Sequence, residues 1–219
     1  PQNTELTLTV AEDGQNVTST AKTIQITLPE KPYQGFDDVK RSDWFYQDVK
    51  FVNQAGLMIG ISDTLFAPDS SANRAMIATI LHRLSGAPAP TKANPYTDLK
   101  QGAYYYDAVL WCTENGIFEG YGNGMFGPTH PITREQLAVV LHRYTEKYLG
   151  QDVSDRADLQ ETYRDSARIS RWATDGVSWA TATGLMKGYP DGTVLPLNNE
   201  KRSEIAAMFH RYCVNFLDV

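Results

Sequence analysis

The sequence predicts a mainly α-helical fold of three helix-loop-helix repeats that form a pseudo-threefold bundle, preceded by a short two-stranded β segment. One observation is a spacing that occurs three times: Arg74, Arg134 and Arg202 each follow a proline by six residues and precede a His-Arg pair by eight. Equal spacings on both sides of one residue type indicate an internal repeat. The other observation is that apolar residues recur at helical spacing on both sides of the loop that carries the proline.

Composition and charge exclude several functions. The chain has 219 residues and a net charge of -6. An acidic chain argues against nucleic acid as a partner, and the lack of an apolar run of about 18 residues argues against membrane insertion. Because the chain starts at Pro1 rather than at a methionine, we expect a piece of a longer protein. Cys112 is interpreted as a buried free thiol, and a Cys112–Cys213 bridge is the less favoured alternative.

Residues 1–35 differ from the rest of the chain. Apolar residues alternate with Thr or Gln over 6–10 and 24–28, and a turn sequence lies between them. This pattern is typical of two half-buried strands. Two strands alone are marginally stable, so we expect either the end of an upstream β-rich module with its linker, or a ribbon that lies on the main domain.

Three units follow, expected at residues 36–90, 91–150 and 151–219. Each opens with an aromatic residue two positions before an aspartate and continues into a helix with one apolar face that ends at a glycine. A polar stretch at 151–160 makes the third unit longer and is interpreted as a surface linker. The aromatic, aspartate and closing glycine are Phe36, Asp38 and Gly56, then Tyr96, Asp98 and Gly116, then Tyr163, Asp165 and Gly184.

A second glycine, a turn and the proline then lead into the second helix of each unit. For the middle copy, Thr133 with Gln136 fits a capping box, and Asn73 can cap the first copy alone. Lys201 cannot cap, so the third of these helices is expected to begin at Asn198 or Asn199. Units of this kind cannot bury their apolar faces singly, so we expect them to pack together with the second helices inside.

Taken together, the aromatic-x-Asp opening, the tryptophan at the first helix, Gly-x₃-Gly, Phe-x-Pro and Thr-Arg-x-Glu/Gln resemble the S-layer homology (SLH) domain family. The resemblance covers residues 36–217 as three consecutive units. It implies a three-pronged all-α pseudo-trimer. It also implies non-covalent anchoring of extracellular surface proteins to the secondary cell-wall polysaccharide of Gram-positive-type bacteria, often through a pyruvate-ketal-modified N-acetylmannosamine. No cofactor, metal or catalytic activity is implied.

The resemblance also assigns ligand-binding residues to every unit. They are Arg74, Arg134 and Arg202; Asp38, Asp98 and Asp165; Trp44, Tyr104 and Trp172; and Gly60, Gly120 and Gly188. The chain departs from the family pattern where Asn73 and Lys201 replace the motif threonine and where Tyr104 replaces the tryptophan. We therefore expect unequal sites of which only one or two bind, with the best motif in the second unit and the best aromatic in the third.

The chemistry of these residues suits an anionic sugar. A guanidinium matches a carboxylate in geometry, and a helix N-terminus adds backbone donors and a favourable dipole. The alternative is that each arginine pairs with the opening aspartate of its unit and fixes the loops. Trp44 and Trp172 could stack on a sugar or fill the core, whereas Trp111 and Trp179 lie beside the apolar stripe and are expected in the core.

Three other interpretations remain open. His82, His142 and His210 could meet on the threefold axis and bind zinc, although packed or surface histidines are favoured. A protein-interaction or self-assembly module of a surface layer is the alternative to polysaccharide binding. The third is a fragment of an enzyme whose chemistry lies upstream, because no nucleophile motif or acid/base pair nominates a catalytic site within these residues.

Overall fold

A computed structural model describes residues 4–6, 24–26, 28, 31–33 and 35–217. The secondary structure is mainly helical, as predicted. Two short strands, β1 (Thr4–Leu6) and β2 (Ile24–Ile26), pair antiparallel with Glu5 opposite Gln25. Most of the other residues of the predicted β segment, including its turn, lie outside the described part of the chain.

Three helices begin at the repeated arginine: α2 (Arg74–Leu84), α4 (Arg134–Arg143) and α7 (Arg202–Leu217). The predicted caps are present on the first two. Oδ1 of Asn73 accepts the N–H of Met76, and Thr133 and Gln136 form the capping box. At α2 and α4 the local caps agree with the contacts between units, because Asn73 and Thr133 are also held in isolated β-bridges, to Pro131 and Asn199.

The second helix of the third unit was expected to begin at Asn198 or Asn199. This prediction is wrong, because the helix begins at Arg202. Asn199 and Lys201 are held in isolated β-bridges to Thr133 and Ser71, which keep this stretch extended up to Arg202. In place of a cap, the carboxylate of Glu204 accepts the N–H of Lys201 at 2.9 Å. Contacts with the neighbouring units thus override the local signal from the asparagines.

The first helices of the units are α1 (Tyr46–Gln54), α3 (Tyr106–Glu114) and α6 (Thr174–Ala182). Each is followed after two residues by the predicted glycine in the left-handed region: Gly56 has φ 67°, Gly116 φ 68° and Gly184 φ 70°. Glycine takes this conformation without the steric cost of a Cβ.

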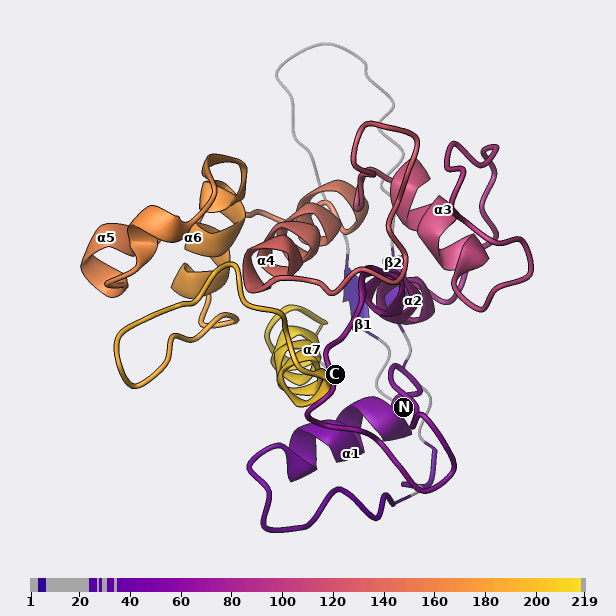
Figure 1. The fold of residues 1–219 in the computed structure, drawn as a ribbon, viewed down its shortest axis with the longest axis horizontal. Helices are drawn as coiled ribbons and strands as arrows, with labels where there is room; N and C mark the ends of the chain where they lie inside the picture. Colours follow the sequence, from indigo (N-terminus) through magenta and orange to yellow (C-terminus); the bar gives the residue numbers. More distant parts are fainter. Residues whose placement is uncertain (1–3, 7–23, 27, 29–30, 34, 218–219) are drawn as a thin grey trace.

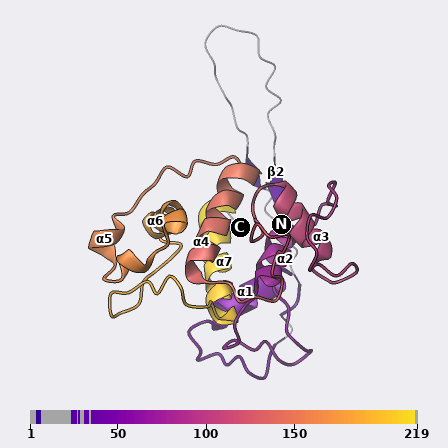
Figure 2. The ribbon, with the colours of Figure 1, turned by 45° about the horizontal axis from the view of Figure 1, so that its top comes forward.

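The helices pair between units rather than within them. The first helix of one unit packs on the second helix of the preceding unit, so α3 lies on α2, α6 on α4, and α1 on α7. Figure 1 shows α2, α4 and α7 around the centre with α1, α3 and α6 outside them, and Figure 2 gives the same arrangement from another side. The α1–α7 pair joins the last unit to the first.

The segments that precede the second helices are joined by backbone hydrogen bonds that also close on themselves. The N–H of Ile132 donates to the carbonyl of Ala72, that of Glu200 to Ile132, and that of Ala72 to Glu200, at 2.9–3.0 Å. These three positions, two residues before each repeated arginine, are therefore equivalent. Their side chains are all buried, although one of them is a glutamate.

The remaining helical elements are short. They are the π-helix η1 (Tyr144–Tyr148), α5 (Leu159–Thr162), and the 3₁₀-helices η2 (Ser166–Arg168) and η3 (Arg171–Ala173). The stretch 151–160 is not only a surface linker, because Val153 and Leu159 are buried and Oγ of Ser178 donates to the carbonyl of Ala157. Strand β2 joins the main core through Ile26.

Candidate ligand-binding grooves

Each repeated arginine reaches across to the glycine-rich loop of the following unit. Nε and Nη2 of the guanidinium each donate to a backbone carbonyl there, at 2.7–3.0 Å. The partners are Phe126 and Glu119 for Arg74, Val194 and Lys187 for Arg134, and Phe66 and Ile59 for Arg202. All three side chains are 5% exposed. The arginines thus fix the loops, but through carbonyls of another unit.

The opening aspartates hold the same loops from the other side. Each carboxylate accepts two consecutive backbone N–H groups within its own unit, at 2.7–2.9 Å. The pairs are Asp38 with Phe66 and Ala67, Asp98 with Phe126 and Gly127, and Asp165 with Val194 and Leu195. Among the described residues no aspartate of this set forms an ion pair with a repeated arginine. Instead, each aspartate binds the N–H of one peptide group, and a repeated arginine donates to the carbonyl of the same group.

At the N-terminus of each second helix, the first two backbone N–H groups are already used. The first two N–H groups of each helix donate to loop carbonyls of the following unit, for example Arg74 to His130 and Ala75 to Pro128. The third N–H of α2 is capped by Asn73. Our expectation that an anion would bind these backbone groups is therefore wrong, because the close packing of the units already uses them.

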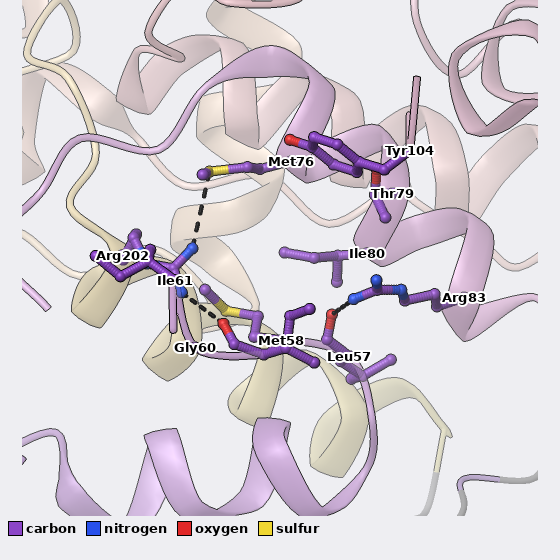
Figure 3. A pocket seen from close by; sticks show the side chains of 11 residues that line it. Leu57, Met58, Gly60, Ile61, Met76, Thr79, Ile80, Arg83, Tyr104 and Arg202 are labelled. Carbon is purple, nitrogen blue, oxygen red and sulfur yellow. Dashed lines mark hydrogen bonds between the residues drawn. The ribbon is translucent and has the colours of Figure 1, made fainter. Parts of the chain in front are cut away.

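One groove lies beside Arg202 and has a volume of about 360 Å³. Figure 3 shows it between the 57–61 loop and the face of α2 that carries Met76, Thr79 and Ile80, with Arg202 and Arg83 at opposite ends. Tyr104 from the second unit covers it and is 64% exposed. Residues of all three units therefore build this groove.

The Arg202 groove is apolar in its walls and positive in its charges. Its lining includes Arg202 and Arg83 and no carboxylate. Within the described part of the chain, the one hydrogen-bond contact of Arg202 Nη1 is with the Met76 sulfur, at 3.9 Å. Partial burial raises the pKa of the Tyr104 hydroxyl, and the charges of Arg202 and Arg83 act against that rise. Burial lowers the pKa of both arginines, yet a guanidinium stays protonated at neutral pH.

A second groove, of about 230 Å³, lies beside Arg134. Trp44 of the first unit lines it and is 66% exposed. The other lining residues include Lys187, Gly188, Tyr189, Glu200, Glu204 and Arg211. Arg134 lies over the ring of Tyr189 and forms an ion pair with Glu200 at 2.9 Å. This groove is therefore more polar than the first, and its arginine already has a carboxylate partner.

The equivalent position beside Arg74 has a different environment. The guanidinium lies over the rings of Phe118, Tyr121 and Phe126 at 4.6–5.1 Å. No hydrogen bond is formed by its Nη1 within the described part of the chain. From the order of units in the other two grooves we expect Trp172, which is 58% exposed, beside Arg74.

The arginine and the aromatic of one groove thus come from different units. Arg134 is grouped with Trp44, and Tyr104 with Arg202. The sequence pattern places the best Thr-Arg motif and the best aromatic in different units, because the unit with the full Thr-Arg motif lacks the tryptophan. The structure resolves this separation, because the groove of Arg134 receives its tryptophan from the first unit.

The second glycines allow a close approach of the opening aromatic ring. A Cβ on Gly60 or Gly188 would lie 2.6 Å from Cε1 of Phe36 or Tyr163, and one on Gly120 would meet the ring of Tyr96. Such contacts are closer than packed atoms allow. Gly60 and Gly188 also line the two grooves.

Sequence reasoning missed several groove residues. Arg83 and Arg211 of the His-Arg pairs were used only as spacing markers, yet both line grooves and donate to the carbonyls of Leu57 and Leu185. Their fixed distance from the repeated arginine was a visible signal. Tyr189, directly after the second glycine, was also missed.

The other candidates have packing roles. Trp111 and Trp179 are buried, as predicted, and both cysteines are free and buried. The three histidines are not gathered on an axis; each packs against an aromatic ring of the first helix beside it. Among the described residues no three His, Cys, Asp or Glu side chains are placed to hold a metal ion. None of the helices described is long and apolar enough to span a membrane.

Known proteins resemble this chain over most of its length. It is 36% identical over 171 residues to an endoglucanase of Bacillus sp. (strain KSM-635), with 78% of this chain and 18% of that protein covered. It is 32% identical over 161 residues to a cellulosome-anchoring protein of Acetivibrio thermocellus, covering 72% and 35%. A surface-layer 125 kDa protein of Lysinibacillus sphaericus is 30% identical over 179 residues, covering 80% and 14%. The chain thus spans only a small part of these relatives.

The profile of the S-layer homology domain matches three stretches of the chain. They are residues 35–75, 95–138 and 162–206. Each stretch begins at or just before the aromatic-x-Asp opening and ends within the second helix, so it contains the loop that the neighbouring arginine holds. On these matches and on the relatives, the chain belongs to the S-layer homology domain family, with three tandem repeats.

Proposed function

We propose that this chain is a non-catalytic anchoring module that binds secondary cell-wall polysaccharide at the bacterial cell surface. Family membership supports a role at the cell surface, and relatives named as cellulosome-anchoring and surface-layer proteins fit it. The three repeats are proposed to form a pseudo-threefold body. The closed ring of helix pairs and backbone hydrogen bonds supports this arrangement.

The main support for polysaccharide binding is the composition of the Arg202 groove. It combines two arginines without a carboxylate, apolar walls and the exposed ring of Tyr104. Its volume of about 360 Å³ falls within the range typical of small-molecule sites. A pyruvylated amino sugar has a carboxylate for the guanidinium and apolar ring faces for the aromatic. We assign Arg202, Arg83 and Tyr104 to direct contact with it.

The remaining site residues are assigned by the same order of units. Arg134 with Trp44, and Arg74 with Trp172, would contact ligand in the other two grooves. The opening aspartates and the second glycines would act by holding the loops that form the walls. Several weak sites on one repeating polymer would add to each other through avidity.

The test uses the exposed aromatics, because replacing them leaves the buried contacts of the arginines intact. Wild type and the triple variant Trp44→Ala, Tyr104→Ala, Trp172→Ala are incubated with purified cell walls of Gram-positive-type bacteria, and the bound fraction is measured in the pellet. We expect wild type to sediment with the walls and the triple variant to remain in solution.

Two controls make the result specific. A matched variant with phenylalanine at the same three positions keeps the rings and should bind. Walls treated with mild acid, which removes the ketal, should retain less wild-type protein. Equal sedimentation of wild type and the alanine variant, with unchanged circular dichroism, would refute the proposal.

A further inference from the structure

Glu200 lies at the floor of the Arg134 groove and its side chain is fully buried. Its Oε1 accepts a hydrogen bond from Nη1 of Arg134 at 2.9 Å. Its Oε2 is buried and accepts no hydrogen bond from a described donor, and the carboxylate of Glu204 is close enough to hydrogen-bond with Glu200 when one of the two is protonated. A buried polar atom that lacks a partner lowers the stability of the fold. Packing alone therefore does not explain why a carboxylate occupies this position.

The position of Glu200 is apolar in the other two units. The ring of backbone hydrogen bonds makes Glu200 equivalent to Ala72 and Ile132, and both of these side chains are buried. Aliphatic side chains therefore serve the packing at this point. Only the third unit places a carboxylate there, and it lies on the arginine of the second unit.

This carboxylate makes the three arginines unequal. On Arg134 the Nη1 group is used by Glu200, whereas on Arg202 its one hydrogen-bond contact among the described residues is with a thioether sulfur at 3.9 Å. On Arg74 no hydrogen bond is formed by Nη1 within the described residues. In all three arginines Nε and one N–H of Nη2 donate to carbonyls, so Nη1 is the guanidinium nitrogen without a carbonyl partner.

We propose that Glu200 is an internal competitor for anionic ligands in the Arg134 groove, so that an anion binds there only together with a proton on Glu200. The inference rests on the proposed function for the identity of the anion, a sugar carboxylate. When Glu200 is protonated, the group is neutral and Nη1 of Arg134 can bind the ligand carboxylate. The grooves of Arg202 and Arg74 bind the same anion without taking up a proton.

The surroundings of Glu200 bring its protonation into a pH range that binding experiments can cover. Burial raises the pKa of Glu200 to about 8, Arg134 acts in the opposite direction, and Glu204 raises it further. Arg211 from α7 also lowers it. Tyr189 faces the same cluster from the loop and donates its hydroxyl to Glu204 at 2.9 Å. The charged groups around Glu200 thus come from α4 and α7, and the loop adds the neutral hydroxyl of Tyr189 and the charged Lys187 to the same groove.

The test follows each groove separately by ¹⁹F NMR. The protein is labelled with 5-fluorotryptophan, and a Trp44→Phe variant identifies the Trp44 signal, which reports on the Arg134 groove. Tyr104→Trp places an equivalent reporter in the Arg202 groove. The probe is the methyl glycoside of N-acetylmannosamine with a 4,6-linked pyruvate ketal, titrated between pH 6 and pH 9.5.

The expected results differ between the grooves. The affinity reported by Trp44 should fall about tenfold for each pH unit above the pKa of Glu200, which is the dependence of one coupled proton. In Glu200→Gln, where the amide oxygen can still accept from Arg134, this affinity should become independent of pH. The affinity reported at position 104 should change less than about twofold. Glu114→Gln, which removes a carboxylate outside both grooves, should behave as wild type.

The other possible results contradict the inference, and one of them also contradicts the proposed function. A pH-independent affinity at Trp44 in wild type, or the same slope in Glu200→Gln, overturns the inference. Binding at position 104 without binding at Trp44, in wild type and Glu200→Gln alike, overturns the inference and leaves the proposed function standing. No binding at either reporter overturns both.

Discussion

Arg202 donates from Nε to the backbone carbonyl of Phe66 at 2.8 Å, and this contact joins the last repeat to the first. Its Nη2 donates to a second carbonyl of the same repeat. The corresponding arginines of the first two repeats make the same pair of contacts with the repeat that follows them. The repeated arginine therefore has a structural role that does not depend on a ligand.

Replacing Arg202 by alanine should lower the free energy of unfolding by about 2–4 kcal/mol, because two carbonyls lose their donor. Urea unfolding followed by circular dichroism at 222 nm measures this change. Arg202→Lys keeps the charge but lacks the two-pronged geometry, and it should lie between alanine and wild type. An alanine variant as stable as wild type would show that the contact with Phe66 contributes little.

Much of the fold could be predicted from the sequence because its signals are local. The caps of Asn73 and Thr133 and the left-handed glycines after the first helices depend on a few neighbouring residues, and the structure contains them. The start of α7 could not be predicted in this way. It depends on bridges from Asn199 and Lys201 to other repeats, and the local sequence does not record them.

Several residues that line the two grooves could be named from the sequence, but their grouping could not. Spacing alone identified Arg202 and Tyr104 as equivalent to residues of other repeats. It could not show that they share a groove, because each first helix packs on the preceding repeat. Nor could it show the ion pair between Arg134 and Glu200, since Glu200 occupies a position that is aliphatic in both other repeats.

Tyr104 and Arg202 should act together in ligand binding although they belong to different repeats. Tyr104→Ala should weaken binding of a monovalent pyruvylated sugar to the Arg202 groove by about fivefold, on the order of 1 kcal/mol for an aromatic contact. Combined with Arg202→Lys, the loss should be smaller than the sum of the single losses, because residues in one site are coupled. Isothermal titration calorimetry of the four proteins measures the coupling.

Trp44 provides the matched control for this cycle. It lines the Arg134 groove and not that of Arg202. Trp44→Ala combined with Arg202→Lys should therefore give additive losses. Coupling of Trp44, rather than Tyr104, with Arg202 would mean that the grooves are grouped differently from the structure.

Gly120→Ala should destabilise the chain more than an alanine at a glycine in open space. The added methyl group would lie 2.6 Å from the carbonyl oxygen of Met125 and against the ring of Tyr96. We expect a loss of about 3 kcal/mol from this overpacking. At Gly122 the φ is +81° with no atom within 4 Å of a Cβ, so Gly122→Ala should cost only about 1–2 kcal/mol from backbone strain. Thermal unfolding of both variants would show this order, and the reverse order would contradict it.

The stability of the chain should fall as the pH rises towards 8, and Glu200 should be a main cause. Burial raises its pKa from 4.5 to about 8. Between these values the folded chain holds a proton that the unfolded chain has released, so the free energy of unfolding decreases with pH and levels off above about 8. One pKa unit corresponds to about 1.4 kcal/mol, which gives a decrease on the order of 5 kcal/mol from this group. Glu200→Gln has no proton to lose and should flatten the curve, whereas Glu114→Gln should keep the slope. Urea unfolding from pH 4.5 to pH 9 measures the free energy of unfolding of the three proteins. Parallel curves for wild type and Glu200→Gln would show that Glu200 keeps its charge in the fold. In that case Arg134 would stabilise the carboxylate more than burial destabilises it.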